Sequence, residues 1–204
     1  MNFPESGLYA ITKTENRTAE QIISDVSEAI RGGIRILQYR DKQPRDAATL
    51  AGALKELCHA HNIPLIINDD IALAKRIGAD GVHIGKEDQQ LNYAREQLGT
   101  NAIIGVSCYD SIDLAIQAQQ LSADYVAFGR FFPSTSKPLA APAHITTLQL
   151  ASSSIKVPIV AIGGILPENG ADLLTAGADL LAVIGGIFTP TPYQSTQAYQ
   201  ALFK

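Results

Sequence analysis

Eight short apolar runs, spaced along a chain of 204 residues, constrain the fold more than any other feature of this sequence. Most runs are apolar at every position rather than at alternate positions, which is typical of parallel strands buried on both faces. Amphipathic segments with helical spacing separate them, so predicted strands alternate with predicted helices. The runs are residues 7–11, 34–39, 64–68, 81–84, 102–106, 125–128, 158–162 and 180–184.

A three-residue turn recurs before three of these runs. It reads Gly78-Ala79-Asp80, Ser122-Ala123-Asp124 and Gly177-Ala178-Asp179. Glycine supplies the left-handed conformation that ends a helix, and aspartate can bond backbone in the turn. A repeated helix–strand unit favours a closed barrel over an open flavodoxin-like sheet. We predict a single-domain (β/α)8 TIM barrel over residues 1–204, with short helices, since this length is near the lower limit for the fold.

Charge and composition narrow the class of partner. The net charge is −4, and the sequence has no basic run of the kind that follows a nucleic-acid backbone. No apolar segment is long enough to span a membrane, and residues 1–13 lack the apolar core of a signal peptide. We therefore expect a cytoplasmic enzyme that acts on small molecules and binds neither nucleic acid nor membranes. The oligomeric state, including a homo-oligomer, stays open.

Cationic and amide side chains follow the second run. The active site of a (β/α)8 barrel forms where strands end and the next loops begin. Gln38, Arg40 and Lys42 alternate there and share one face of an extended segment. Two cations and an amide suit an anionic ligand, although a solvated surface loop would show the same residues.

Carboxylates follow the third and fourth runs. Asp69 and Asp88 would lie at the mouths of adjacent strands, where carboxylates can hold one Mg²⁺ that also binds substrate phosphate. Helix capping is the alternative for such residues, and we assign it to Asp70. The prediction is thus one magnesium ion held by Asp69 and Asp88.

Glycine pairs follow the last two runs. Barrels of this type often bind phosphate with the loops after strands seven and eight. Gly163-Gly164 and Gly185-Gly186 would let backbone N–H groups approach the phosphate oxygens closely. The longest irregular stretch, residues 129–143, adds Ser134-Thr135-Ser136-Lys137 as a second phosphate-binding element, if it is not simply a polar loop.

Two further polar residues have ambiguous roles. Ser107, after the fifth run, either bonds substrate or caps the next helix, and His83 is expected to pack inside the barrel. No histidine pairs with a credible nucleophile, so acyl transfer by a Ser-His-Asp arrangement has no support. Cys58 and Cys108 have no metal-ligand spacing and are expected to be free thiols.

Gln38-Tyr39-Arg40-Asp41-Lys42 resembles the Q-x-R-x-K motif of the thiamine-phosphate synthases. Five further motifs follow in that family's order, and the resemblance extends from about residue 8 to about residue 188. These motifs are Ile67-Asn68-Asp69, Gly81 to Asp88, Gly105-Val106-Ser107, Pro133 to Lys137 and Ala161 to Ile165.

The resemblance implies a transferase that joins 4-amino-2-methyl-5-hydroxymethylpyrimidine diphosphate to 4-methyl-5-(2-phosphoethyl)-thiazole or its carboxylated form, releasing diphosphate. It implies a single Mg²⁺ on Asp69 and Asp88, and catalytic roles for Arg40, Lys42, Ser107 and Lys137. The implied pyrimidine diphosphate site comprises Gln38, Tyr39, Arg40, Asp41, Lys42, Asn68, Ser107 and Lys137. The implied thiazole phosphate site comprises Ser134, Thr135, Ser136, Gly164, Ile184 and Gly185.

Two departures and two alternatives accompany this resemblance. Ser134-Thr135-Ser136 stands where the family often has Thr-x-Thr, and Gly185 where it commonly has serine, which removes one hydroxyl but keeps the backbone donor. A thiazole tautomerase of the same superfamily would bind the thiazole phosphate without diphosphate or metal. A non-catalytic barrel that binds a phosphate ligand is the third interpretation.

Overall fold

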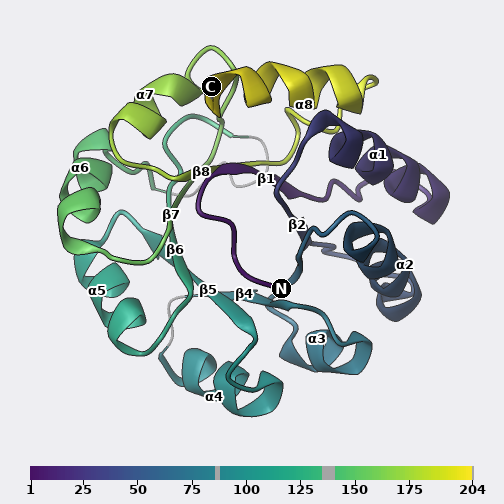
Figure 1. Cartoon of the computed structure of the whole chain (residues 1–204), viewed down its shortest axis with the longest axis horizontal. Helices are drawn as coiled ribbons and strands as arrows, with labels where there is room; N and C mark the ends of the chain where they lie inside the picture. The colour runs from purple at the N-terminus through teal and green to yellow at the C-terminus, as the bar shows by residue number, and fades with distance from the viewer. Residues whose placement is uncertain (86–87, 135–140, 204) are drawn as a thin grey trace.

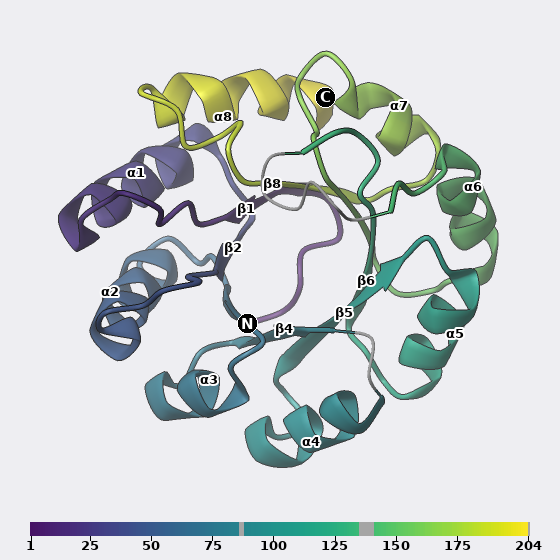
Figure 2. The same ribbon diagram turned by 180° about the vertical axis from the view of Figure 1, so that it is seen from behind.

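Eight parallel strands close into a barrel in the computed structural model, which describes residues 1–85, 88–134 and 141–203. Each strand pairs with its sequence neighbours, and β1 closes the barrel by pairing with β8. Helices surround the barrel, as Figure 1 and the reverse view in Figure 2 show. The strands are β1 (Gly7–Ile11), β2 (Ile36–Tyr39), β3 (Leu65–Asn68), β4 (Gly81–Ile84), β5 (Ile103–Tyr109), β6 (Tyr125–Phe128), β7 (Ile159–Ile162) and β8 (Leu180–Val183).

The helices are short, as predicted, because a chain of 204 residues must supply a strand and a helix for each unit of the barrel. In the first helix, local sequence sets both ends. Thr18 caps the N-terminus with Gln21 in a reciprocal capping box, and Gly33 ends the helix at φ 106°. The helices are α1 (Ala19–Gly32), α2 (Ala47–His59), α3 (Ile71–Ile77), α4 (Asp88–Leu98), α5 (Ile112–Gln120), α6 (Ile145–Ser154), α7 (Gly170–Thr175) and α8 (Pro192–Gln200), followed by the 3-10 turn Ala201–Phe203.

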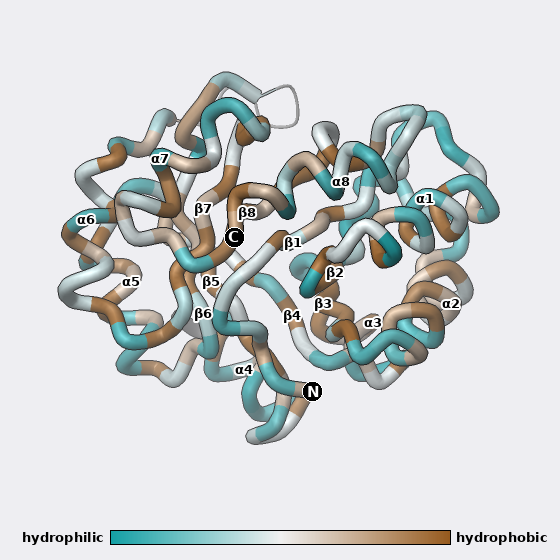
Figure 3. Tube along the Cα trace, turned by 45° about the horizontal axis from the view of Figure 1, so that its top comes forward, coloured by the Kyte–Doolittle hydropathy of each residue, from teal (hydrophilic) through white to brown (hydrophobic). Residues whose placement is uncertain are grey.

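Two apolar cores hold the barrel together. The larger lies between the sheet and the helices, and it takes one side of each strand, for example Leu8 and Ala10 of β1. The smaller fills the barrel interior and takes the alternate side, including Tyr9 and Ile11. Figure 3 shows hydrophobic residues along the central strands and alternation of hydrophobic and hydrophilic residues along the helices. Burial on both faces explains why the predicted strands are apolar throughout.

The repeated turn carries out the same task three times. The carboxylates of Asp80, Asp124 and Asp179 accept the backbone N–H of Leu65, Ile104 and Ile159, at 2.8, 2.8 and 2.7 Å. Each aspartate side chain thus accepts a hydrogen bond from the start of the preceding strand. The sequence had suggested a bond to backbone within the same turn. Gly78 and Gly177 adopt positive φ, and Ser122 does so without being glycine. The left-handed conformation predicted for the two glycines is confirmed, and Ser122 adopts it without having been predicted to.

The fifth strand is longer than predicted. It continues to Tyr109, so Ser107 lies inside β5, opposite Ala127 of β6, rather than in the following loop. Ser111, not Ser107, caps the next helix through the N–H of Leu114. None of the helices in the described part of the chain has the length and apolarity needed to cross a membrane.

Candidate active site

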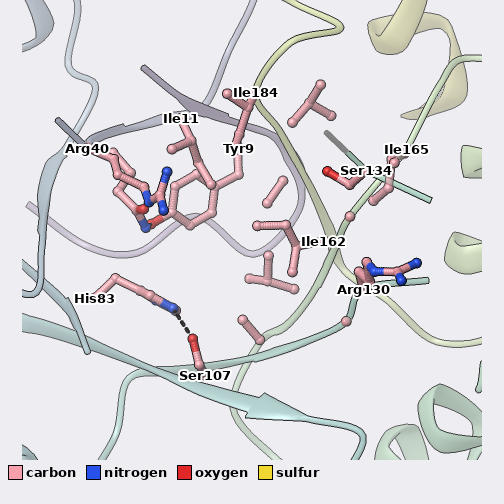
Figure 4. Close-up of a pocket in the computed structure, with 18 of the residues that line it drawn as sticks. Tyr9, Ile11, Arg40, His83, Ser107, Arg130, Ser134, Ile162, Ile165 and Ile184 are labelled. Carbon is pink, nitrogen blue, oxygen red and sulfur yellow. Dashed lines mark hydrogen bonds between the residues drawn. The ribbon is translucent and has the colours of Figure 1, made fainter. Parts of the chain in front are cut away.

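A cavity of about 640 Å³ opens at the carboxyl end of the barrel, and all eight strands contribute to its wall. This is the end at which the loops after the strands converge in such barrels. Figure 4 shows Arg40 and His83 on one side of the cavity and Ser134 and Ile165 on the other. The aliphatic side chains of Ile162 and Ile184 lie between them. The cavity therefore has a polar wall, an apolar middle and a second wall made largely of loop backbone.

Gln38 and Arg40 place an amide and a cation on the same wall, as predicted from their alternation. Gln38 is 3% exposed, and its Nε2 donates to the Tyr9 hydroxyl at 2.8 Å. The backbone of Arg40 is held from β1: its N–H donates to Thr12 Oγ1 at 2.8 Å, and its carbonyl oxygen accepts from the same hydroxyl at 3.0 Å. Thr12 therefore fixes the backbone position from which the Arg40 side chain extends along the wall. Lys13 adds a second positive charge there.

Asn68 and Asp69 lie where β3 ends. Asp69 has φ 61°, a left-handed conformation that is uncommon outside glycine, and its N–H donates to the His83 carbonyl at 2.8 Å. Its Oδ2 accepts from Asn68 Nδ2 at 2.7 Å. Both residues line the cavity, whereas Asp70 caps α3 through the N–H of Leu73, as predicted. The sharp turn thus separates a cavity-facing carboxylate from a structural one.

The fit of a magnesium ion rests on Asp69. Asp69 lines the same cavity as Arg40, and Mg²⁺ is usually held by one or two carboxylates together with substrate phosphate and water. Asp88 begins α4, directly after β4, but its side chain is outside the described part of the structure. Among the described residues, no cluster of three or more His, Cys, Asp or Glu side chains could hold a metal by itself. Asp69 therefore has the chemistry of one magnesium ligand, and the metal site itself stays a prediction.

Glycine turns form the opposite part of the wall. Gly163 and Gly164 have φ 105° and 64°, and a Cβ at Gly164 would lie 2.4 Å from the Pro133 carbonyl oxygen. Only glycine fits there without displacing the chain. At Gly185, by contrast, an added Cβ would meet nothing within 4 Å, so the structure has open space for a side chain at this position.

Gly185 and Ile184 both line the cavity, as does Ser134. Ser134 belongs to the loop after β6. The other predicted phosphate-binding residues of that loop lie outside the described residues; they are Thr135, Ser136 and Lys137. Their roles stay predictions.

Three residues of the Q-x-R-x-K segment are not part of the cavity wall. Tyr39 is buried toward the helices, and its hydroxyl donates to Asp41 Oδ2 at 3.4 Å. Burial, with the nearby carboxylates, raises the pKa of Tyr39, which keeps the hydroxyl protonated. Lys42 is exposed. A part in substrate binding for Tyr39, Asp41 or Lys42 remains a prediction.

Tyr9 and Tyr109 are wall residues that escaped prediction from the sequence, whereas His83 was expected inside the barrel and Ser107 at the substrate site. Tyr9 and His83 point into the barrel from the middle of their strands, and Ser107 is joined to His83 by a hydrogen bond of 2.9 Å that Figure 4 marks. Tyr109 reaches the rim and has φ 56°. The available signal was strand periodicity: a polar residue at an inward-facing position near the carboxyl end must face the cavity.

A closed (β/α)8 barrel with a polar cavity at its carboxyl end and glycine turns after β7 and β8 is typical of enzymes that bind phosphate-bearing small molecules. The family described as "Thiamine monophosphate synthase" matches residues 8–187. The chain therefore belongs to the thiamine-phosphate synthase family and is a transferase.

Individual relatives of the chain support the same family assignment. The chain is 44% identical to the thiamine-phosphate synthase of Thioalkalivibrio sulfidiphilus, over 97% of this chain and 95% of that protein. It is 50% identical to the enzyme of Saccharophagus degradans, over 89% and 85%. The solved structure of a thiamine phosphate pyrophosphorylase from Pyrococcus furiosus is 30% identical, covers 97% of this chain and 95% of its own, and superposes with a TM-score of 0.86. The predicted fold and family are both confirmed.

Proposed function

We propose that the chain couples 4-amino-2-methyl-5-hydroxymethylpyrimidine diphosphate with 4-methyl-5-(2-phosphoethyl)-thiazole, or its carboxylated form, to give thiamine phosphate and diphosphate. The observation that supports this reaction is a single cavity with two polar walls on opposite sides. Arg40, Asn68 and Asp69 form one, and the glycine turns with Ser134 form the other. Two phosphorylated substrates can thus enter from opposite sides and meet over the apolar middle.

The chemistry requires no protein nucleophile. The bond between the pyrimidine CH₂ carbon and the diphosphate oxygen breaks, the electron-rich aminopyrimidine stabilises the carbocation, and the thiazole nitrogen attacks that carbon. Arg40 neutralises charge that develops on the departing diphosphate, with Lys42 and Lys137 as further predicted cations. Ser107 and Gln38 lie at the cavity floor, where they orient the pyrimidine or its leaving group.

One magnesium ion completes this wall in the proposal. Asp69 would hold it together with Asp88, and the bound ion would supply charge neutralisation of the diphosphate. Asn68 keeps the Asp69 carboxylate in place by donating to Oδ2. We also propose that residues 1–204 form one catalytic domain, because the eight units close on one another. The cytoplasmic location and the homo-oligomer remain predictions.

A turnover assay tests the proposed reaction. The purified chain is incubated with both substrates and Mg²⁺, and thiamine phosphate and diphosphate are quantified separately. We expect equimolar formation of the two products, and loss of turnover when the metal is chelated. Isomerised thiazole phosphate without metal would instead show a tautomerase, and binding of thiazole phosphate without any product would show a non-catalytic barrel. Either result would reject the proposal.

A further inference from the structure

Five side chains form a continuous line of hydrogen bonds across the barrel beneath the cavity. Gln38 Nε2 donates to the Tyr9 hydroxyl at 2.8 Å, and that hydroxyl lies 2.8 Å from the hydroxyl of Tyr125. Tyr125 lies 2.9 Å from His83 Nδ1, and His83 Nε2 lies 2.9 Å from Ser107 Oγ. The line begins and ends at two residues of the cavity wall, on β2 and β5.

Tyr125, in the middle of this line, is fixed on every side. Its ring is fully buried and stacks on Phe3 with centroids 4.1 Å apart and planes at 14°. The His83 ring lies on it at 5.5 Å and 27°. Gly105 of β5 leaves space for the ring, since a Cβ there would lie 1.9 Å from Tyr125 Cζ. The Tyr125 hydroxyl therefore has a defined position without help from substrate.

The donors in the line have an order. Gln38 donates an N–H to Tyr9, and the distances alone leave the donor open in the next two contacts. The order in which every hydroxyl proton of the line finds an acceptor within the line runs from Tyr9 to Tyr125 and from Tyr125 to His83 Nδ1. Burial raises the pKa of both tyrosines, which therefore remain neutral donors. A neutral imidazole that accepts at Nδ1 carries its proton on Nε2 and donates that proton to Ser107.

We propose that Tyr125 is a positioning residue that fixes His83 in the Nε2-protonated tautomer, so that Ser107 accepts from His83 and points its own proton into the cavity. Its catalytic consequence rests on the proposed function. A diphosphate offers only acceptor oxygens, so Ser107 can serve it only as a donor. With the opposite tautomer, Ser107 would give its proton to His83 and present lone pairs to an anion, which is repulsive.

The tautomer can be measured without turnover. The ¹⁵N chemical shifts of the imidazole nitrogens are recorded on the full chain without substrate, and His83 is assigned from the signals lost in His83→Asn. We expect a neutral ring protonated on Nε2, and loss of this preference in Tyr125→Phe. A ring protonated on Nδ1, or an unchanged tautomer in Tyr125→Phe, would overturn the proposal. Because substrate is absent, this outcome is independent of whether the chain makes thiamine phosphate.

Kinetics separate positioning from packing. Tyr125→Phe keeps the ring and removes one hydroxyl, and we expect kcat to fall about tenfold while KM for the thiazole phosphate stays unchanged. Phe3→Leu is the matched control, since it removes the stacking partner but leaves all the hydrogen bonds. It should keep the tautomer and keep kcat within about twofold. An equal loss of kcat in both variants would contradict the proposal, because packing alone would then explain the effect.

Discussion

At the scale of single residues, the site depends on short-range contacts that separate neighbouring side chains into different roles. Asp69 and Asp70 are adjacent carboxylates, yet one faces the cavity and the other caps a helix. The left-handed backbone of Asp69 makes that division, and Asn68 holds the cavity-facing carboxylate. Thr12 similarly fixes the backbone from which Arg40 extends. These contacts make single substitutions informative, because each role has a neighbour that serves as its control.

Asp69→Asn should remove the magnesium dependence that Asp69 is proposed to carry. We expect kcat/KM to fall on the order of a hundredfold, with the thermal unfolding temperature nearly unchanged, because the side chain supports metal and not fold. Asp70→Asn is the control: asparagine also caps helices, so activity and its Mg²⁺ titration should match the parent chain. Equal losses in both variants would remove Asp69 from the metal site.

Arg40→Ala should impair the handling of diphosphate more than the binding of thiazole. We expect KM for the pyrimidine diphosphate to rise about tenfold or more, since a charge-assisted contact is lost, while KM for the thiazole phosphate stays within about twofold. Arg45→Ala removes an exposed arginine farther along the same loop and should change neither. Initial rates with each substrate varied in turn measure both constants. A parallel rise for both substrates would contradict a cavity with two separate anion walls.

At the scale of elements, carboxylates hold together parts of the chain that are distant in sequence. Asp110, which follows β5, accepts from the His144 N–H at 2.9 Å, lies 2.7 Å from His144 Nδ1 and also accepts from Thr147 Oγ1 at 2.5 Å. It therefore holds the N-terminal end of α6 from outside that helix. Residue 144 also follows the loop whose serines belong to the predicted phosphate site, so Asp110 sets where that loop ends.

Asp110→Asn should destabilise the fold in a pH-dependent way. Burial alone would raise the pKa of Asp110, but hydrogen bonds from Thr147 and His144 outweigh it and lower the pKa. The stabilisation is thus present above the usual carboxyl pKa of 3.8 and is lost as the pH falls through the lower folded-state value. We expect a loss of about 1 kcal/mol in unfolding free energy at neutral pH, shrinking below about pH 4.

Denaturant unfolding at several pH values measures this loss. Asp113→Asn, at an exposed position in the first turn of α5, should show a much smaller change. A loss of stability for Asp110→Asn that stays constant into acid would mean that the carboxylate charge plays no part.

At the scale of the whole molecule, the barrel interior holds the hydrogen-bonded line of side chains because a large residue on one strand packs against a glycine on the next. Tyr125 of β6 fills the interior, and Gly105 of β5 provides the space for it. The first residues of the chain cross the barrel in Figures 1 and 2, and Phe3 stacks on Tyr125. The interior is therefore a packed core up to the cavity floor, not a channel.

Gly105→Ala should disturb this packing. Because a Cβ would overlap Tyr125 Cζ, we expect a loss of about 1–3 kcal/mol in unfolding free energy, measured by denaturant titration. Gly52→Ala is the matched control: Gly52 lies within α2 and an added Cβ meets nothing, so that variant should gain about 0.5–1 kcal/mol. If both variants were stabilised, the tyrosine would be free to move, and its positioning role would lose its basis.

The fold was predictable because parallel strands buried on both faces appear in the sequence as uninterrupted runs of apolar residues. The runs at 7–11, 81–84 and 125–128 match the observed strands residue for residue. The end of β5 was not predictable, since the polar residues of Ser107-Cys108-Tyr109 resemble a loop. Arg40, Asp69 and the glycine turns, which the sequence predicted at the strand ends, do line the cavity, while their roles remain predictions. The line through Tyr125 was not, because strand register, absent from the sequence, decides which inward side chains meet.

The central claim is that one cavity holds diphosphate and thiazole phosphate on two separate walls. A crystal structure of the chain with Mg²⁺, diphosphate and thiamine phosphate tests it directly. We expect the diphosphate within hydrogen-bond distance of Arg40, a metal ion on Asp69, and the product phosphate at the backbone N–H groups of Gly164 and Gly185. Diphosphate bound away from Arg40 and Asp69, or both phosphates on one wall, would contradict the account.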